Sequence, residues 1–95
     1  MTAYMVYIRD RMKDPAEFKK YEEISQKANP QGARKPLAYY GKIETLEGPT
    51  IDGATIIPFD SIEAAKKAYN DPTYQKAIPY RLKGADYRVF IVEGV

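Results

Sequence analysis

The side chains that this sequence offers for chemistry are tyrosines, carboxylates, lysines and arginines. Its 95 residues include nine tyrosines but no histidine and no cysteine. Imidazole bases, thiolate nucleophiles, disulfides and zinc or haem sites built on His or Cys are therefore excluded. The carboxylates form no recognisable metal set, and no glycine-rich loop has the spacing of a phosphate cradle. We expect no metal and no cofactor, and the motifs leave open whether the protein is an enzyme.

Arg81 is the first candidate for a binding residue. Tyr74 and Arg81 share one helical face if Pro79 does not end the helix between them. A fixed guanidinium at this position could hold a carboxylate or enolate oxygen. The alternative is a structural ion pair with a carboxylate such as Asp60 or Glu47, and such pairs are more common than binding sites.

Four tyrosines are further candidates. Tyr39 and Tyr40 are neighbours in a predicted strand, so one should face the helices and the other the opposite side of the sheet. A phenol there could donate to a ligand oxygen or, with a lowered pKa, act as a general acid or base. Tyr69 and Tyr74 flank an Asn-Asp-Pro break and could line the mouth of a pocket. Core packing is the alternative for all four, and the predicted ligand-binding set is Arg81, Tyr40, Tyr69 and Tyr74.

Helix signals position these residues along the chain. Asp14 and Asp71 each precede a proline, and Asp60 lies three residues before Glu63, so all three aspartates are predicted helix caps and weak catalytic candidates. Pro79 should end or kink the last helix near Ile78. The expected elements begin with a strand at 3–8 and a helix from 15 that stops at Asn29-Pro30. A strand at 37–46, for which a break or bulge at Gly41 stays open, and a strand at 54–59 follow, joined by a turn at 47–50. Helices from 61 and 72 and a strand at 87–92 complete the order.

This β-α-β-β-α-β order, with the second helix split in two, predicts an α+β ferredoxin-like fold in one domain, residues 1–95. The four-stranded antiparallel sheet would carry its helices on one face. Because the first and last strands are apolar on both alternating sets, the other face needs a cover, and the simplest is a second copy. A chain this short buries only about 60–65% of its unfolded surface, which also favours a homodimer through the sheet face.

Several short motifs are spread in a fixed order over nearly the whole chain. They are Asp14-Pro15 before the Tyr21 helix, Leu46-Glu47-Gly48, Phe59 with Ser61, Glu63-Ala64-Ala65, Tyr69-Asn70-Asp71-Pro72 with Tyr74-Gln75, Arg81, and Val92-Glu93-Gly94. Together they resemble one family, the domain-of-unknown-function family numbered 1330 in the dimeric α/β-barrel superfamily. The resemblance implies a ferredoxin-like protomer, a homodimer whose sheets form a barrel, and no established common activity. Related families are cofactor-free monooxygenases, lactone isomerases and haem enzymes, and the lack of histidine disfavours His-ligated haem.

The charge distribution and the hydropathy limit the kinds of partner that the protein can bind. The net charge of +2 comes from 15 basic and 13 acidic residues without a basic stripe, so we expect no nucleic-acid binding. The longest apolar stretch, at 3–8, is far too short to span a membrane, and we expect a cytoplasmic protein.

We therefore expect a small dimeric α/β-barrel protein that binds an acidic or enolic metabolite, with aromatic compounds among the candidates. If it is an enzyme, the resemblance implies a cofactor-independent monooxygenase, isomerase or lyase, in which the protein supplies orientation and electrostatics. Two alternatives stay open. One is a non-catalytic ligand-binding module, and the other is a structural dimerisation module without a pocket.

Overall fold

Strand β1 (Ala3–Met12) lies inside a four-stranded antiparallel sheet in the computed structural model, which describes residues 1–28 and 34–95. The strand order is β2-β3-β1-β4, as in a ferredoxin-like fold. β1 extends beyond its predicted end at Ile8 because its last residues still pair with the start of β4. The other strands are β2 (Ala38–Tyr39), β3 (Gly53–Phe59) and β4 (Ala85–Glu93).

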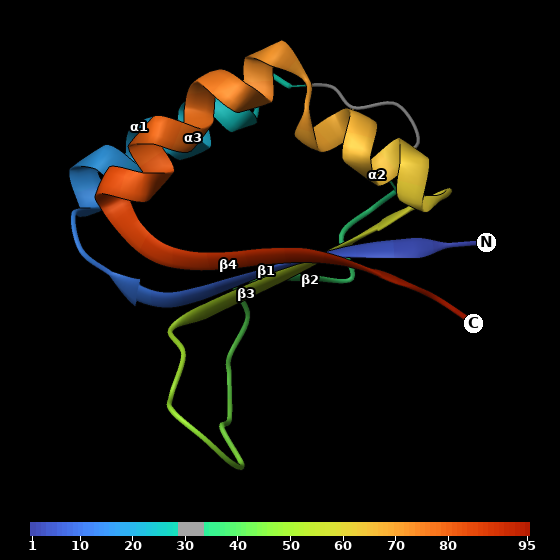
Figure 1. Ribbon diagram of the computed structural model, residues 1–95. Helices are drawn as coiled ribbons and strands as arrows, with labels where there is room; N and C mark the ends of the chain where they lie inside the picture. The colour runs from blue at the N-terminus through green and yellow to red at the C-terminus, as the bar shows by residue number, and fades with distance from the viewer. Residues whose placement is uncertain (29–33) are drawn as a thin grey trace.

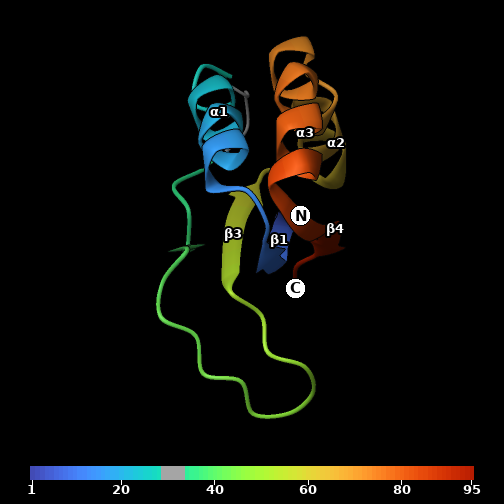
Figure 2. The same cartoon turned by 90° about the vertical axis from the view of Figure 1, so that its left-hand side faces the viewer.

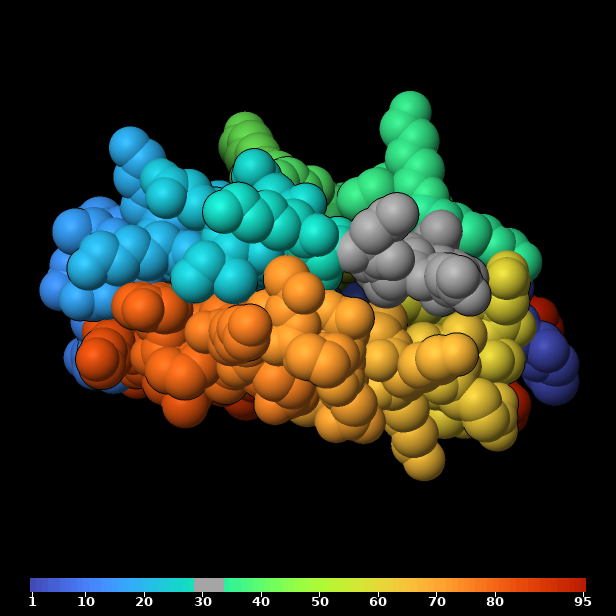
Figure 3. Space-filling model, turned by 90° about the horizontal axis from the view of Figure 1, so that it is seen from above, coloured from blue at the N-terminus to red at the C-terminus, as the bar shows by residue number. Residues whose placement is uncertain are grey.

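Three helices cover one face of this sheet (Figure 1). Seen from the helix side, α1 and α3 lie next to each other and cover the strands (Figure 3). The Asp14 carboxylate accepts hydrogen bonds from the amides of Ala16 and Glu17, which confirms the predicted cap of the first helix. The predicted stop at Asn29-Pro30 lies outside the described residues. The helices are α1 (Pro15–Ser25), α2 (Ile62–Tyr69) and α3 (Pro72–Gly84).

The cap of α2 differs from the prediction. Ser61, not Asp60, is the N-cap residue, and its Oγ accepts a hydrogen bond of 3.0 Å from the amide of Ala64. The Asp60 carboxylate instead binds the Arg34 guanidinium, with a closest approach of 2.8 Å. Asp60 thus ties the segment before β2 to the start of α2.

Helix α3 continues through Pro79, so of the two predicted outcomes, an end or a kink near Ile78, the end is excluded. Proline removes one backbone donor from the helix, which by itself is destabilising. Ala77 and Arg81, on either side of Pro79, are both buried. Tertiary packing on both sides of the proline therefore holds the helix together, because most helix stability in proteins comes from such packing.

The predicted strand from Leu37 to Leu46 is wrong over most of its length, although the two residues of β2 do pair antiparallel with β3. Tyr40 has a positive φ of 53°, which takes the chain out of the extended conformation directly after β2. Residues 41–52 then form an arm without strand pairing. This arm projects from the sheet on the side opposite to the helices (Figure 1 and Figure 2).

The two faces of the sheet differ in what covers them. On the helix side, Met5, Tyr7 and Phe59 form a core with Phe18 and Tyr21 of α1. The strand register places the alternate residues on the opposite face, which no other part of the described chain covers as a layer (Figure 1). That open face carries mostly apolar side chains, from Tyr4, Val6, Ile8, Ala54, Ile56, Pro58, Arg88, Phe90 and Val92.

Candidate functional site

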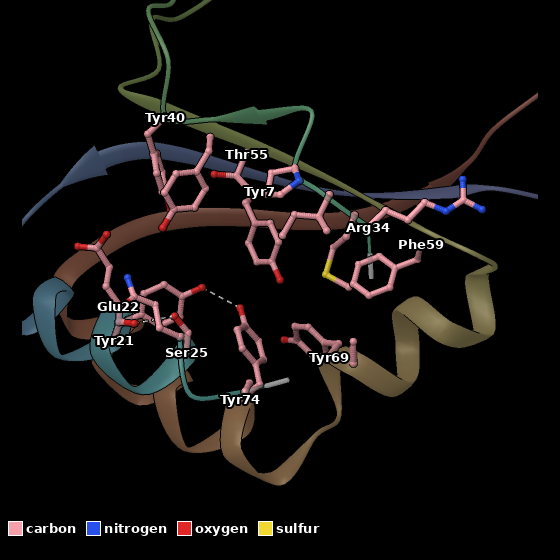
Figure 4. A pocket seen from close by; sticks show the side chains of 17 residues that line it. Tyr7, Tyr21, Glu22, Ser25, Arg34, Tyr40, Thr55, Phe59, Tyr69 and Tyr74 are labelled. Atoms are coloured by element: carbon pink, nitrogen blue, oxygen red, sulfur yellow. Dashed lines mark hydrogen bonds between the residues drawn. The ribbon is translucent and has the colours of Figure 1, made fainter. Parts of the chain in front are cut away.

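A cavity of about 270 Å³ lies between the helix-side face of the sheet and the helices (Figure 4). Aromatic rings make up much of its wall, and Tyr7, Tyr21, Tyr69 and Tyr74 all contribute. The other lining residues are Met5, Glu22, Ser25, Gln26, Ala28, Arg34, Pro36, Tyr39, Tyr40, Thr55, Ile57, Phe59 and Ala68. The cavity is thus a mainly apolar space with hydroxyl groups at a few points, which is typical of small-molecule sites.

Tyrosine hydroxyls meet at one end of the cavity. The Tyr21 and Tyr74 hydroxyl oxygens are 2.9 Å apart, and Figure 4 shows the hydroxyl ends of Tyr7 and Tyr69 directed toward Tyr74. The Tyr7 and Tyr74 phenols are close enough to affect each other's pKa. Three separate elements, β1, α1 and α3, bring Tyr7, Tyr21 and Tyr74 together, since the three residues are far apart in sequence.

Arg81 lies behind this group of tyrosines. It does not line the cavity, but its Nη1 donates a hydrogen bond of 2.8 Å to the Tyr74 hydroxyl. Its guanidinium carbon is 5.6 Å from the centre of the Tyr21 ring and 5.4 Å from that of Tyr87. Aromatic faces and one phenol oxygen therefore surround the cation.

Arg81 is 4% exposed, yet it has no carboxylate partner within 4.0 Å among residues 1–28 and 34–95. The alternative of an ion pair with Asp60 or Glu47 is wrong, since Asp60 pairs with Arg34 and Glu47 lies in the exposed arm. The Arg81 Nε is also buried, and none of the described residues accepts a hydrogen bond from it.

Burial raises the pKa of the Tyr7, Tyr21 and Tyr74 phenols above their ordinary value of 10.0. The apolar surroundings penalise the phenolate, and this effect is larger than the stabilisation by nearby Arg81. These hydroxyls therefore stay protonated at neutral pH and serve as hydrogen-bond donors. None of these three phenols has the lowered pKa that a general base would need.

A second cluster fixes Tyr40 at the other side of the cavity. The Arg9 guanidinium lies 4.8 Å from the centre of the Tyr40 ring and 5.1 Å from that of Phe18, and it pairs with Asp52. The Tyr40 hydroxyl is hydrogen-bonded to the Tyr87 hydroxyl. These contacts stabilise the unusual positive φ of Tyr40, which would be unfavourable without them.

The predicted site residues thus occupy two positions. The structure places Tyr40, Tyr69 and Tyr74 on the cavity wall and Arg81 behind it. The expectation that Tyr39 and Tyr40 face opposite sides is wrong, because both line the cavity, with ring centres 4.9 Å apart. The positive φ of Tyr40 breaks the alternation on which that expectation rested.

Sequence reasoning missed Tyr7, Tyr21, Thr55 and Arg34 as cavity residues. Tyr7 and Tyr21 belong to apolar stripes, and their hydroxyls were the available signal, since a buried phenol needs a polar partner. The Thr55 hydroxyl is buried on the cavity wall and has no hydrogen-bond partner among the described residues. Arg34 precedes a strand in a segment without periodicity, so nothing in the pattern indicated its place.

The chemistry available here is hydrogen-bond donation by neutral hydroxyls in an apolar space, with Glu22 as the one carboxylate among the described lining residues. No group of three or more acidic side chains within 1–28 and 34–95 could hold a metal ion. Within the same ranges, none of the helices is both long and apolar enough to cross a membrane.

The fold and the tyrosine-rich cavity between sheet and helices are those of a small α+β protein of the ferredoxin-like class. The chain belongs to DUF1330, a family of domains of unknown function, whose model matches residues 2–95. The predicted family and fold are therefore confirmed. Among curated proteins, none matches this chain.

Solved structures with the same fold support this class. A protein of unknown function from Rhodopseudomonas palustris is 21% identical, with a TM-score of 0.70, over 99% of this chain and 82% of that one. A dimeric ferredoxin-like protein of unknown function from Jannaschia sp. CCS1 is 13% identical, with a TM-score of 0.75, over 99% and 100% of the two chains. SnoaB, a cofactor-independent oxygenase from Streptomyces nogalater, is 10% identical, with a TM-score of 0.65, over 99% and 93%.

Proposed function

We propose that this protein binds a small aromatic compound with an acidic or enolic oxygen in the tyrosine-lined cavity. The observation that carries the proposal is the set of protonated tyrosine hydroxyls backed by the buried Arg81, at one end of an apolar cavity. Hydrogen-bond donors next to a cation favour a ligand oxygen that is rich in electrons. The buried Thr55 hydroxyl supplies a second polar point for the ligand.

The volume of the cavity limits the size of the ligand. A dry cavity of about 150 Å³ accommodates benzene, and the cavity here measures about 270 Å³. One aromatic ring with a few substituents therefore fits. The aromatic wall favours a planar ligand, because rings gain from stacked or edge-to-face contacts.

A cofactor-independent oxygenase, isomerase or lyase is the catalytic form of this proposal. The likeness of the fold to SnoaB supports it only at the level of the fold. In that case the ligand would supply the reactive electrons, and Glu22, the one carboxylate among the described lining residues, would be the candidate for proton exchange. A non-catalytic binding protein with the same cavity is the alternative, and turnover of any identified ligand distinguishes the two.

We also propose that the protein is a homodimer in which two open sheet faces pack together as a barrel. The apolar residues of that face support this, since Phe90 and Val92 are 46% and 48% exposed in the protomer. Structural neighbours described as dimeric ferredoxin-like proteins support it as well. A cytoplasmic location stays a prediction from the composition.

Thermal unfolding with a panel of single-ring phenols, enols and aromatic acids tests the binding proposal. A ligand present at about 100 times its Kd stabilises the folded protein by about 2.7 kcal/mol, which is easily measured. Ala68→Trp is the matched variant, because Ala68 lines the cavity and an indole there would fill it. We expect stabilisation of the wild type and none of the variant. Equal stabilisation of both would place the ligand elsewhere and contradict the proposal.

A further inference from the structure

Arg81 poses an energetic problem for the folded protein. An ionised group transferred from water to an apolar interior is strongly disfavoured unless it is paired and fully hydrogen-bonded. Arg81 is 4% exposed, and the partners of its guanidinium among the described residues are uncharged phenols, those of Tyr74, Tyr21 and Tyr69. Its Nε remains without a partner. The site therefore carries a positive charge that nothing in the described chain neutralises within ion-pair distance.

The hydrogen bonds around Tyr74 connect that charge to the cavity. A phenol oxygen has two lone pairs and one hydrogen. One lone pair of Tyr74 accepts from Arg81, and the other can accept from the Tyr21 hydroxyl, 2.9 Å away. The Tyr74 hydrogen is then directed toward the Tyr7 hydroxyl and the cavity that both tyrosines line, where a ligand oxygen would take the place of Tyr7 as acceptor. Donation by the cation makes that hydrogen a stronger donor, because chained hydrogen bonds polarise one another.

We propose that the end of the cavity formed by Tyr7, Tyr69 and Tyr74 is an oxyanion site, which binds the phenolate or enolate form of the ligand through one oxygen. Arg81 is the positioning residue of this site and acts through Tyr74. The inference rests on the proposed function and specifies the charge state and the binding mode of the ligand. The bound anion would supply the negative charge that Arg81 lacks.

The geometry favours a phenolate or enolate over a carboxylate. Carboxylates are bound best by the forked guanidinium of an arginine that faces them, with two parallel hydrogen bonds. Arg81 does not line the cavity, so its fork is not presented to a ligand there. The tyrosine hydroxyls instead converge on one region (Figure 4), which suits the concentrated charge of one oxygen. Arg34, which does line the cavity, already binds Asp60.

The probe for this proposal is p-nitrophenol, a single-ring phenol whose ionised form absorbs visible light. The experiment follows its absorbance at a pH at which the free probe is mostly neutral, while binding is measured separately by calorimetry. Each hydrogen bond gains strength when its acceptor becomes charged, by an amount that corresponds to roughly a tenfold change in the ionisation constant. We expect the bound probe to be at least tenfold more acidic than the free probe, with its proton released to the buffer.

Two variants locate the source of this effect. Arg81→Met removes the charge with an unbranched side chain of similar length, and Tyr74→Phe removes the hydroxyl that connects Arg81 to the cavity. Each should still bind the probe but reduce its acidity roughly tenfold. Arg34→Met tests the alternative that the anion lies at the charge on the cavity wall. Lys66→Met is the control, because it removes an equal charge that is exposed on α2 and does not line the cavity, and it should leave the acidity unchanged. Circular dichroism confirms that each variant is folded.

The outcomes separate the two proposals. If p-nitrophenol and related phenols do not bind at all, the proposed function itself is contradicted. If the probe binds in the wild type as the neutral phenol, the binding proposal stands and the oxyanion site is overturned. If Arg34→Met rather than Arg81→Met reduces the acidity, the anion lies at Arg34, and the role of Arg81 is also overturned.

Discussion

Arg81 is the residue on which the account of the site depends, and its cost to folding can be measured. Replacement of a buried ion pair by apolar side chains of similar volume is often neutral or stabilising, by about 1–4 kcal/mol, and Arg81 has no partner charge among the described residues that its removal would leave unpaired. Arg81→Met should therefore be at least as stable as the wild type without ligand. Denaturant unfolding checks this. A clearly lower free energy of unfolding would identify Arg81 as a structural residue held by its contacts with Tyr74, Tyr21 and Tyr87.

The buried tyrosines predict how stability depends on pH. The pKa values of Tyr7, Tyr21, Tyr74 and Tyr87 are raised in the folded protein, mainly by burial, whereas in the unfolded chain these phenols ionise near pH 10. Their stabilising contribution is therefore fully present below pH 10 and is lost as the pH rises above it.

Phenolate absorbance and circular dichroism, followed together in an alkaline titration, check this expectation. The four buried tyrosines should ionise only when the protein unfolds, so the part of the absorbance change that belongs to them should coincide with the change in circular dichroism above pH 10. Ionisation of all nine tyrosines near pH 10 with the fold intact would show that every hydroxyl is accessible, and it would contradict the burial of these four.

At the residue scale, the helical spacing of Tyr74 and Arg81 predicts that the two side chains share one face of α3. They do form a hydrogen bond with each other. The sequence pattern could not predict where Tyr74 and Arg81 lie relative to the cavity, because that depends on Tyr7 of β1 and Tyr21 of α1. Long-range juxtaposition of this kind leaves no periodic signal in one sequence.

At the element scale, Gly84 controls the packing of α3 against α1. A Cβ atom there would lie 2.6 Å from the backbone nitrogen of Phe18 and 2.9 Å from its Cα. Backbone atoms cannot move aside as a flexible side chain would. Gly84→Ala should therefore lower the free energy of unfolding by roughly 1–3 kcal/mol, as overpacking does.

Gly41→Ala is the matched control, because a Cβ atom there would meet nothing within 4 Å. It should change stability by no more than about 0.5 kcal/mol. Denaturant unfolding of both variants checks the comparison. Equal effects of the two substitutions would contradict the close approach of α3 to Phe18.

Some helices and strands could be predicted from the sequence and others could not. Strands β1 and β4 are apolar on both alternating sets, and α1 has a cap followed by proline, so their signals are local and strong. The segment from 37 to 46 contains alternating apolar residues as well, but Tyr40 adopts a positive φ and the chain leaves the sheet. The contacts that stabilise this conformation, from Arg9 and Tyr87, are distant in sequence and could not be read from the segment itself.

At the scale of the whole molecule, the open sheet face determines the expected assembly. A solution mass of twice the protomer mass of 10.8 kDa is expected for the wild type. Phe90→Glu places a charge in the apolar face and should yield monomers, because an unpaired charge in an interface is strongly disfavoured. Light scattering at micromolar concentration checks both.

Lys66→Glu is the control for this experiment, since Lys66 is exposed on α2, on the other side of the sheet. It should remain dimeric. A wild-type protein that is monomeric under these conditions, or a Phe90→Glu variant that is still dimeric, would contradict an interface through the sheet face.

A crystal structure of the complex with p-nitrophenol would show whether the tyrosine-lined cavity binds a small phenolic or enolic ligand. We expect the ring inside the cavity, with its phenolic oxygen within hydrogen-bond distance of the Tyr74 hydroxyl, about 2.5–3.0 Å. A probe on the surface, or one inside the cavity with its phenolic oxygen directed to Arg34, would contradict the account.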